Sequence, residues 1–483
     1  MTNGHEPRFI DIITKEIFYK LSDGPLHAGD NLVGLYARAE QMDLLRFVGS
    51  NKVHMIGICG IGGIGKTTVA KAIYNLMYKH FEGRSFCEDV KDVVNRYGLV
   101  HLQTKLLDDI MKDGSLKIQS VGEGICIMKR RMRAKKILVV LDDVDHYNQF
   151  EALAGNPDWF SPGSMIVVTS RDRQLLRAYE VEQIYTIDLL NDDEALELLC
   201  MYAFRDKNLQ DEFSEHVRRI LYYVNGLPLA LKLFGHILFN KTLHEWGSEI
   251  DKLQSSPHVL IQNKLRVSYD GLDADQKNIF LDIACFFKGE KKDYVQQILD
   301  GCEVFYATNL RVLADKSLIT ICEDRIQMHN LVQEMGWQIV REEFEELGKR
   351  SRLWCPTDVC DVLKNDKGTE LVKGLALDLS CSEVNICCQS FIKLKNLRLL
   401  HIYIGALSNF RGTNGIKCKS ELLKETKVCT TGKLEFLSNE LQLLCWHGYP
   451  FQYLPSMFFP ESLLVLDMSY SCIKQIWSGS KVH

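Results

Sequence analysis

The stretch "MIGICGIGGIGKTTVAKAIY", residues 55–74, places five glycines within nine positions, directly before a lysine and two threonines. Glycine loses more backbone entropy on folding than other residues, so this density indicates positive φ angles or close approach of the backbone to a ligand. The spacing Gly60-x4-Gly65-Lys66-Thr67 fits a P-loop, whose N–H groups surround phosphates while its hydroxyl binds Mg²⁺. The predicted phosphate-binding residues are Gly60, Gly62, Gly63, Ile64, Gly65, Lys66, Thr67 and Thr68.

The segments on either side of the glycines fit the same interpretation. Residues 53–59 form a short apolar run, which predicts a buried strand. Val69, Ile73 and Met77 recur every four residues and predict an amphipathic helix. A strand, a glycine loop and a helix in this order direct the helix N-terminus toward an anion. The alternative is a glycine-rich turn without a ligand, but the whole pattern favours nucleotide binding.

Length and composition limit the class of protein. With 483 residues, 46% apolar and 25% charged, the chain is typical of a folded protein of three or four domains. A net charge of −5 gives no general argument for nucleic acid or anionic membrane as a partner. No secretory signal and no membrane-spanning run is evident. The sixteen cysteines contain no CxxC pair, which favours free thiols in a reducing compartment, the cytoplasm or nucleus.

A second motif, "KKILVVLDDVD", carries carboxylates at the end of a predicted strand over residues 137–141. Asp142 is expected to reach Mg²⁺, directly or through water, together with Thr67. Asp143 stands where vigorous ATPases commonly carry a glutamate, so we expect at most slow ATP hydrolysis from this catalytic pair. The alternative is an Asp-Asp turn that follows a core strand.

A third apolar strand lies in "GSMIVVTSRDRQLL" and ends near Arg171. An arginine at the tip of a parallel strand beside a P-loop can contact the γ-phosphate, although Arg171 could instead cap a neighbouring helix. The three continuous apolar strands predict a parallel sheet covered by helices on both faces. The basic cluster at residues 129–136 resembles a nuclear signal, but a solvated helix end is the favoured interpretation.

Beyond residue 191 the pattern becomes helical. Asn225 and Gly226 are expected to end one helix, and Pro228 lies near the start of the next. "KNIFLDIACFF" predicts a core helix with Ile279, Ile283 and Phe287 on one face. "RIQMHNLVQEMG" places His329 ahead of another helix. A lone histidine of this kind is more often structural than a ligand.

The last part of the chain has a different period. Leu375, Leu377 and Leu379 are followed 22 residues later by Leu397 and Leu399, and Leu441 is followed after the same interval by Leu463. Repeats of about 20–29 residues with spaced leucines are typical of a leucine-rich solenoid with one short strand per repeat. The end at "SGSKVH" contains no recognisable cap, which predicts a fragment or a shortened product.

The order of these motifs resembles the plant intracellular immune receptors known as nucleotide-binding, leucine-rich-repeat disease resistance proteins of the TIR class. The resemblance rests on "GIGGIGKTT", "ILVVLDDVD", "GSMIVVTSRD", "GLPLAL", "FLDIACFF" and "MHN". It implies an α/β multidomain chain: a linker (1–30), a P-loop domain with a parallel sheet (31–190), a helical domain (191–258), a winged-helix domain (259–345), a connector (346–372) and the start of an α/β leucine-rich-repeat solenoid (373–483). The TIR domain and its NAD⁺ hydrolysis are expected to be absent.

The resemblance also implies roles for individual residues. Val33 and Gly34 would line the adenine side of the pocket, and Pro228 would pack on the adenine. Arg171 would sense the γ-phosphate, and His329 would touch the β-phosphate of ADP, which reverses the structural interpretation of that histidine. The family usually carries an aspartate after this histidine, whereas this chain has Asn330. Tight autoinhibition is therefore in doubt.

The implied function is a switch in plant defence, with ADP bound in the off state and ATP in the on state. The implied partners are a pathogen effector or a guarded host protein at the leucine-rich repeats, and full-length receptors of the family or further copies of the chain. One alternative is an interaction or decoy protein that binds through its repeats without signalling. A second is an ATPase motor or clamp loader on nucleic acid, which the aspartate at position 143 and the net negative charge disfavour.

Overall fold

The computed structural model describes residues 24–30, 32–112, 116–204, 211–255, 258–299, 306–379, 384–404 and 428–476. Most of the predicted linker, the irregular stretch between the predicted repeats and the C-terminal residues lie outside this part. The chain forms two compact units. The first extends to Ser268 and includes Asp315–Ser317, and the second holds the remaining residues. Within the described part, no helix combines the length and the apolar character needed to cross a bilayer.

A five-stranded parallel sheet forms the centre of the first unit, in the order β2-β3-β4-β1-β5. Its strands are β1 (His54–Cys59), β2 (Gly83–Cys87), β3 (Ile137–Leu141), β4 (Met165–Ser170) and β5 (Gln183–Thr186). The three predicted strands are confirmed as β1, β3 and β4, and every residue in these three is buried. The strands β2 and β5 were not predicted.

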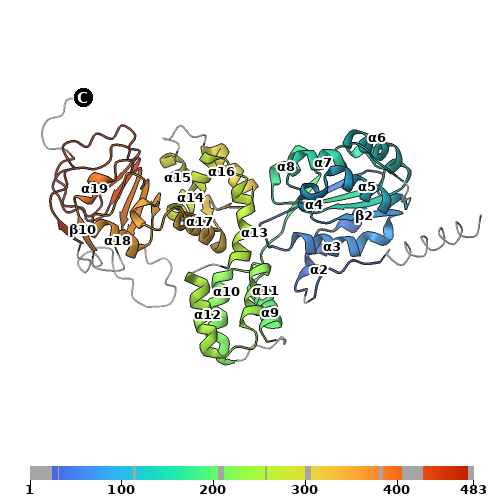
Figure 1. The fold of residues 1–483 in the computed structure, drawn as a ribbon, viewed down its shortest axis with the longest axis horizontal. Coiled ribbons are helices and arrows are strands. Elements are labelled where there is room, and N and C mark those ends of the chain that lie inside the picture. The colour runs from blue at the N-terminus through green and yellow to red at the C-terminus, as the bar shows by residue number, and fades with distance from the viewer. Residues whose placement is uncertain are drawn as a thin grey trace, which may run out of the picture. The chain divides into compact units, whose positions relative to one another are not determined.

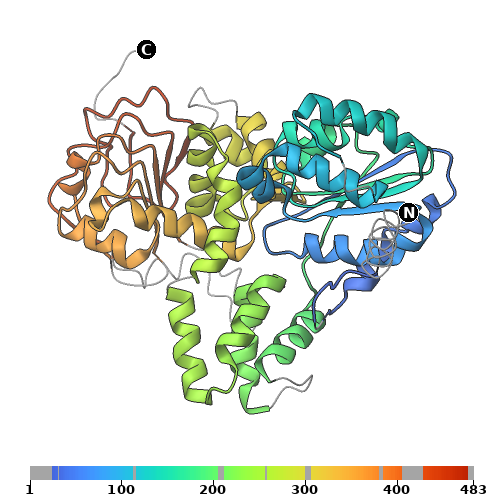
Figure 2. The same ribbon diagram turned by 45° about the vertical axis from the view of Figure 1, so that its right-hand side comes forward.

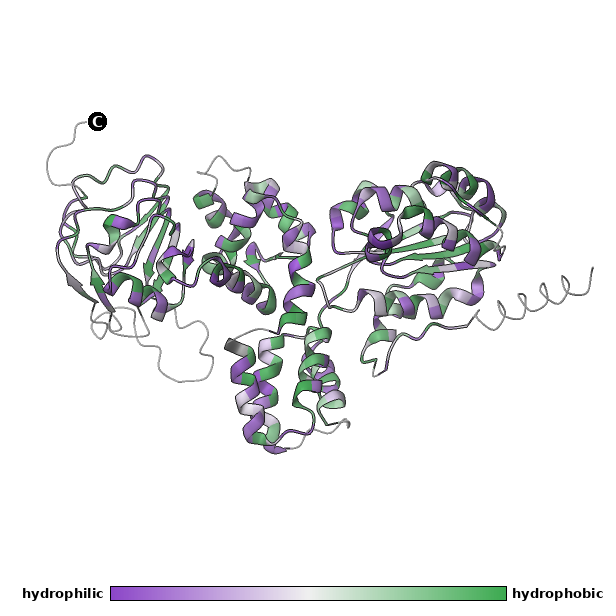
Figure 3. Ribbon diagram, viewed as in Figure 1, coloured by the Kyte–Doolittle hydropathy of each residue, from purple (hydrophilic) through white to green (hydrophobic). Residues whose placement is uncertain are grey.

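Helices cover both faces of this sheet, as the continuous apolar strands predicted. Figure 1 shows α3 (Lys66–Met77) on one face and α5 (Leu99–Met111) and α7 (Tyr147–Ala154) on the other. Figure 3 shows the strands as a hydrophobic layer between helices whose outer sides are hydrophilic. The remaining helices are α2 (Leu35–Gln41), α4 (Val90–Tyr97), α6 (Val121–Arg131) and α8 (Arg173–Ala178). Lys129 and Arg130 are exposed in the last turn of α6, so the basic cluster begins at a solvated helix end.

A group of helices completes the first unit, and Figure 2 shows α9 to α12 packed as a bundle. These helices are α9 (Asp192–Ala203), α10 (Ser214–Val224), α11 (Pro228–Leu238) and α12 (Leu243–Ser255), followed by α13 (Val259–Asp270). The predicted boundaries are confirmed: Asn225 adopts φ 47° at the C-cap of α10, and Pro228 is the first residue of α11. Asn191 caps α9 in a reciprocal capping box with Glu194.

The second unit begins with helices and a short antiparallel hairpin. Its elements are α14 (Ala274–Asp282), a π-helical turn (Ile283–Phe287), α15 (Lys292–Leu299), α16 (Tyr306–Asp315), β6 (Thr320–Cys322), β7 (Arg325–Gln327) and α17 (Asn330–Glu343). Ile279, Ile283 and Phe287 are buried, as the prediction of a core helix requires. The π-helical turn is a local departure from the regular helix that the spacing suggested.

A second five-stranded sheet follows, in the order β14-β13-β11-β9-β8, and all its described pairings are parallel. The elements of this region are β8 (Arg352–Leu353), α18 (Pro356–Lys364), β9 (Gly374–Asp378), β10 (Val384–Cys387), α19 (Ser390–Lys393), β11 (Leu399–Tyr403), β12 (Val428–Thr431), β13 (Leu443–Trp446) and β14 (Val465–Asp467). The strands β10 and β12 pair in parallel as a separate two-stranded sheet. Leu399 pairs with Leu443, which is the predicted distance of two periods. The spaced leucines therefore mark successive parallel strands, while a leucine-rich solenoid stays a prediction.

A buried ion pair lies between α14 and β8 in the second unit. Arg352 donates from Nε to Oδ1 of Asp282 at 2.6 Å, and the two side chains are only 1% and 3% exposed. Arg352 also donates to the carbonyl oxygen of Asn278 at 3.0 Å, and Arg398 lies 3.4 Å from the other Asp282 oxygen. The carboxylate of Asp282 thus contacts two guanidinium groups, that of Arg352 in β8 and that of Arg398 just before β11. Its removal would leave a buried arginine without its charge partner.

We predict that Asp282→Ala lowers the free energy of unfolding of the second unit by about 3–5 kcal/mol, because Arg352 stays buried without compensation. Urea unfolding measures the change. Asp361→Ala is the matched control, because it breaks the exposed Lys367–Asp361 pair and is expected to have a much smaller effect on stability. Equal losses in the two variants would contradict the prediction.

Candidate functional site

The glycine-rich loop follows β1 and has the backbone conformation that its sequence predicted. Gly60, Gly63 and Gly65 have φ values of 155°, 84° and 99°. A Cβ atom on Gly62 would lie 2.7 Å from the carbonyl oxygen of Lys264, and one on Gly63 would lie 2.9 Å from Cβ of Leu229. Side chains at these positions would therefore collide with α13 and α11. The glycines let the loop pass under both helices.

Lys66 begins α3 and is buried beneath the loop. Its Nζ donates to the carbonyl oxygens of Gly60 at 2.8 Å and Ile61 at 3.1 Å. Two effects lower the pKa of Lys66 to about 8: burial, which is the larger, and the positive charge of nearby Arg171. A phosphate group at this loop would favour the charged ammonium and raise that pKa again. The lysine is thus placed to neutralise a phosphate.

The carboxylate of Asp142, just after β3, is fully buried and accepts two hydroxyl hydrogen bonds. Thr67 donates to Oδ2 at 3.0 Å, and Thr169 donates to Oδ1 at 2.7 Å. Burial raises the pKa of this carboxyl, while both hydroxyl groups oppose the rise. A hydroxyl and a carboxylate are oxygen ligands of the kind that Mg²⁺ prefers. Thr67 and Asp142 therefore fit the predicted metal position, and they lie beside the phosphate-binding loop.

Arg171 follows β4 and contacts the second predicted carboxylate. Its Nε lies 3.3 Å from Oδ1 of Asp143, and its Nη1 donates to the carbonyl oxygen of Lys264 at 2.6 Å. Asp172 rather than Arg171 caps α8, and Lys264, which accepts from Arg171, lies inside α13 rather than at its end. Arg171 therefore joins the sheet edge to the helix that passes over the loop.

An apolar pocket brings together residues that the sequence analysis placed around a base. Val33, Ile64, Gly65, Thr68 and Pro228 all line it. Gly34 follows Val33 at the N-cap of α2 with φ 63°. Further apolar walls come from Leu32, Leu35, Ile187, Leu190 and Leu198. The loop before α2, the P-loop, the segment after β5 and the start of α11 thus meet at one cavity.

The sequence analysis missed two basic residues of this pocket, Arg38 and Lys232. Arg38 lies four positions after Gly34, and Lys232 lies four positions after Pro228. In each helix this spacing places the basic residue on the same face as the residue already identified. The helical period was therefore the signal that could have found them.

His329 and Asn330 belong to the second unit, at the start of α17. His329 is the N-cap, and its Nδ1 accepts from the backbone N–H of Leu331 at 3.2 Å. Lys288 donates from Nζ to Oδ1 of Asn330 at 2.8 Å and to Oε1 of Gln333 at 2.9 Å. Asn330 thus supplies an amide oxygen to a partly buried ammonium, where the resembled family usually places a carboxylate.

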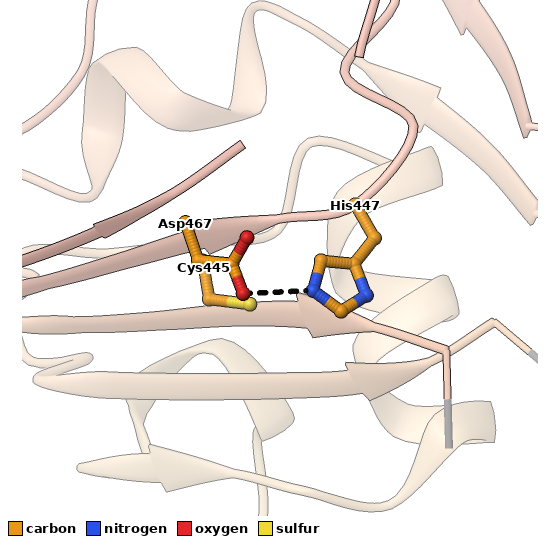
Figure 4. A group of neighbouring side chains, drawn as sticks. All are labelled: Cys445, His447 and Asp467. Carbon is orange, nitrogen blue, oxygen red and sulfur yellow. Dashed lines mark hydrogen bonds and ion pairs between the residues drawn. The ribbon is translucent and has the colours of Figure 1, made fainter. Parts of the chain in front are cut away.

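Among the described residues, Cys445, His447 and Asp467 have potential metal ligands within 4.8 Å of one another (Figure 4). Nδ1 of His447 accepts from the backbone N–H of Ile404 at 3.1 Å, so a neutral ring carries its proton on Nε2. That nitrogen lies 3.1 Å from Oδ2 of Asp467 and donates to it. Both ring nitrogens are thus occupied, and His447 joins β11 to β14 rather than offering a lone pair to a metal.

The described cysteines also agree with the absence of a disulfide framework. None of the described cysteines forms a disulfide. Cys59 and Cys200 are buried, whereas Cys285 is partly exposed and Cys126 is exposed. The described cysteines therefore differ in their access to solvent.

Comparisons with known proteins agree with the order of elements. The NB-ARC domain matches residues 41–209, and the winged-helix domain of Roq1-like disease resistance proteins matches residues 273–344. Disease resistance proteins RPV1 and RUN1 of Vitis rotundifolia are each 40% identical to the chain, over 99% and 100% of its length. TMV resistance protein N of Nicotiana glutinosa is 33% identical over 97% of the chain.

The chain spans 35%, 37% and 39% of the lengths of these three relatives. Among solved structures, a Walker-type ATPase of Pyrococcus abyssi has 14% identity and a TM-score of 0.44, over 62% of this chain and 94% of that one. The family matches cover the P-loop sheet and the hairpin-containing helical segment of the second unit. The chain therefore carries an NB-ARC domain followed by a Roq1-like winged-helix domain, and its relatives are plant disease resistance proteins.

Proposed function

We propose that the chain is the nucleotide-controlled switch of a plant immune receptor, with ADP favouring the off state and ATP the on state. The observation that carries this proposal is the pocket in the first unit, where Val33, Gly65 and Pro228 meet. It combines an apolar cavity with a phosphate-binding loop, which suits a nucleotide with an apolar base side and a charged tail. The relatives named as disease resistance proteins support the setting of plant defence.

In this proposal, the N–H groups of the loop and the ammonium of Lys66 bind the phosphates. Thr67 and Asp142 hold Mg²⁺, which neutralises phosphate charge when bound. Val33 and Gly34 lie at the base side, and Pro228 packs there from α11. His329 of the second unit is proposed to contact the β-phosphate in the off state. Effector or host-protein recognition and self-association are further proposals, drawn from the family.

Arg171 gives the proposal a means to distinguish ATP from ADP. Its guanidinium contacts Asp143 and Lys264, so a γ-phosphate would compete with both for the same hydrogen-bond donors. A ligand shifts a conformational equilibrium only through its differential affinity for the two states. Hydrolysis is proposed to be slow, since Asp143 is engaged by Arg171 and is one methylene shorter than a glutamate.

The first test identifies the nucleotide that purified protein carries. We expect chromatography of the denatured protein to yield close to one ADP per chain. Lys66→Arg is expected to abolish retention, because the longer, forked side chain does not fit the carbonyl oxygens that Lys66 contacts. Lys71→Arg is the matched control on the same helix, where Lys71 forms an ion pair with the exposed Glu88, and it should retain ADP. Normal retention by Lys66→Arg would contradict the P-loop assignment, and folded wild-type protein without nucleotide would favour an interaction-only protein.

The pKa of Lys66 predicts a pH dependence of ADP binding. Because the free protein has a pKa of about 8 at this lysine and a phosphate raises it, binding takes up a proton above that pH. Affinity should therefore be nearly constant between pH 7 and 7.5 and fall by up to about tenfold per unit above pH 8. Titration calorimetry in two buffers of different ionisation enthalpy measures both the affinity and the proton uptake. Constant affinity up to pH 9.5, without proton uptake, would contradict this linkage.

Replacing Asn330 with the aspartate that the family usually carries is predicted to stabilise the second unit. Burial lowers the pKa of Lys288, and a carboxylate at position 330 would pair with its ammonium. Asn330→Asp should therefore raise the free energy of unfolding of the second unit by about 1 kcal/mol. Asn330→Ala removes the acceptor and should lower it. Urea unfolding compares the three proteins, and an aspartate variant no more stable than wild type would contradict the prediction.

A further inference from the structure

A bidentate ion pair joins two segments of the first unit that are far apart in sequence. Nη1 of Arg38, on α2, donates to Oε1 of Glu194 at 2.7 Å, and Nη2 donates to Oε2 at 2.6 Å. The side chains are 18% and 21% exposed, so water screens this pair less than a surface pair. The Arg38 guanidinium also holds the pKa of Glu194 below its usual range.

The same guanidinium also donates to the backbone of two segments beside the pocket. Its Nη1 donates to the carbonyl oxygen of Gly34 at 3.1 Å, and its Nη2 donates to that of Leu189 at 3.4 Å. Gly34 belongs to the loop before α2, and Leu189 belongs to the segment between β5 and α9. The neighbours of these two residues, Val33 and Leu190, line the apolar pocket. The pair therefore fixes the separation of two segments that line the pocket.

The other partner, Glu194, is held equally firmly. Its Oε2 accepts from the backbone N–H of Asn191 at 3.0 Å, and its own N–H donates to Oδ1 of Asn191 at 2.9 Å. The capping box therefore fixes the carboxylate at the N-terminus of α9, where the helix dipole favours negative charge. Gly34 is packed against the pair, since a Cβ there would overlap Nη1 of Arg38 and Oε1 of Glu194.

The phosphate side of the site is organised separately. Lys66 is bound to carbonyl oxygens of its own loop, and Asp142 is bound to Thr67 and Thr169. The carbonyl oxygen of Gly63 accepts from the N–H of Leu229 at 3.2 Å. None of these contacts involves Arg38 or Glu194. A loss of the ion pair should therefore affect the base side and leave the phosphate side in place.

We infer that Arg38 and Glu194 are positioning residues for the base of the nucleotide, acting through the Val33–Gly34 loop and the Leu189–Leu190 segment. This inference rests on the proposed function, because it concerns the same pocket. It assigns the two residues to recognition of the base rather than of the phosphates. Neither residue is required to touch the ligand.

The test compares the affinities of ADP and inorganic pyrophosphate, each measured by displacement of a fluorescent ADP analogue from the full chain. Glu194→Gln preserves the shape of the side chain and removes its charge. We expect ADP to bind about tenfold more weakly to this variant, while the pyrophosphate affinity changes by less than about twofold. Asp251→Asn is the matched control, because it breaks the Arg219–Asp251 pair between α10 and α12, and it should change neither affinity.

A second variant, Gly34→Ala, disturbs the Arg38–Glu194 pair sterically. Gly34→Ala introduces a Cβ into the space that the guanidinium and the carboxylate occupy, at a residue with positive φ. This variant should weaken the binding of ADP more than the binding of pyrophosphate, as is expected of Glu194→Gln. The exchange Arg38→Glu with Glu194→Arg should recover part of the ADP affinity, which a general loss of stability would not produce.

The outcomes separate this inference from the function on which it rests. The positioning role would be overturned if Glu194→Gln weakened the binding of both ligands equally, or if it left the ADP affinity unchanged. The proposed nucleotide switch would stand in either case. Wild-type protein that binds neither ADP nor pyrophosphate would overturn both. A selective loss of ADP affinity in both variants would support the assignment.

Discussion

The hydrogen bonds to the carboxylate of Asp142 determine how the nucleotide-binding edge of the first unit is assembled. One oxygen accepts from Thr67 at the start of α3, and the other accepts from Thr169 near the end of β4. Because Asp142 itself follows β3, a single buried carboxylate holds together the ends of three segments. The strand order places β4 between β1 and β3, so Arg171 emerges between the P-loop and Asp142. The proposed phosphate contacts all depend on this arrangement.

The strands that carry the motifs could be predicted because they are buried along their whole length. His54–Cys59, Ile137–Leu141 and Met165–Ser170 read as continuous apolar runs, which is typical of central parallel strands. The strands β2 and β5 lie at the two edges of the sheet and have mixed sequences, "GRSFC" and "QIYT". The residues of β2 alternate between buried and partly exposed, and those of β5 are partly exposed or exposed. Apolar runs alone therefore did not mark these two strands. Sheet pairing rather than local composition determines these edge strands.

The same distinction applies to the site. The residues from Gly60 to Thr68 and the carboxylate of Asp142 could be predicted because their spacing along the chain is itself the chemical motif. Arg38 and Glu194 are 156 positions apart, and no local pattern relates them. They meet only because α2 and the start of α9 lie at the same side of the pocket. Prediction from sequence therefore reached the phosphate side of the site and missed the contacts that shape its base side.

The contacts around Lys66 and Arg171 suggest how a switch of this kind gains its sensitivity. Both cations have protein partners: Lys66 binds the carbonyl oxygens of Gly60 and Ile61, and Arg171 binds Asp143 and Lys264. In the proposed switch, phosphate groups would compete with those partners, so the number of phosphates would determine which of these protein contacts persist. Lys264 lies on α13, whose first residues belong to the first unit and whose last residues belong to the second. In the proposed switch, a γ-phosphate that draws Arg171 away from Lys264 would therefore act on α13, the helix in which the first unit ends and the second begins.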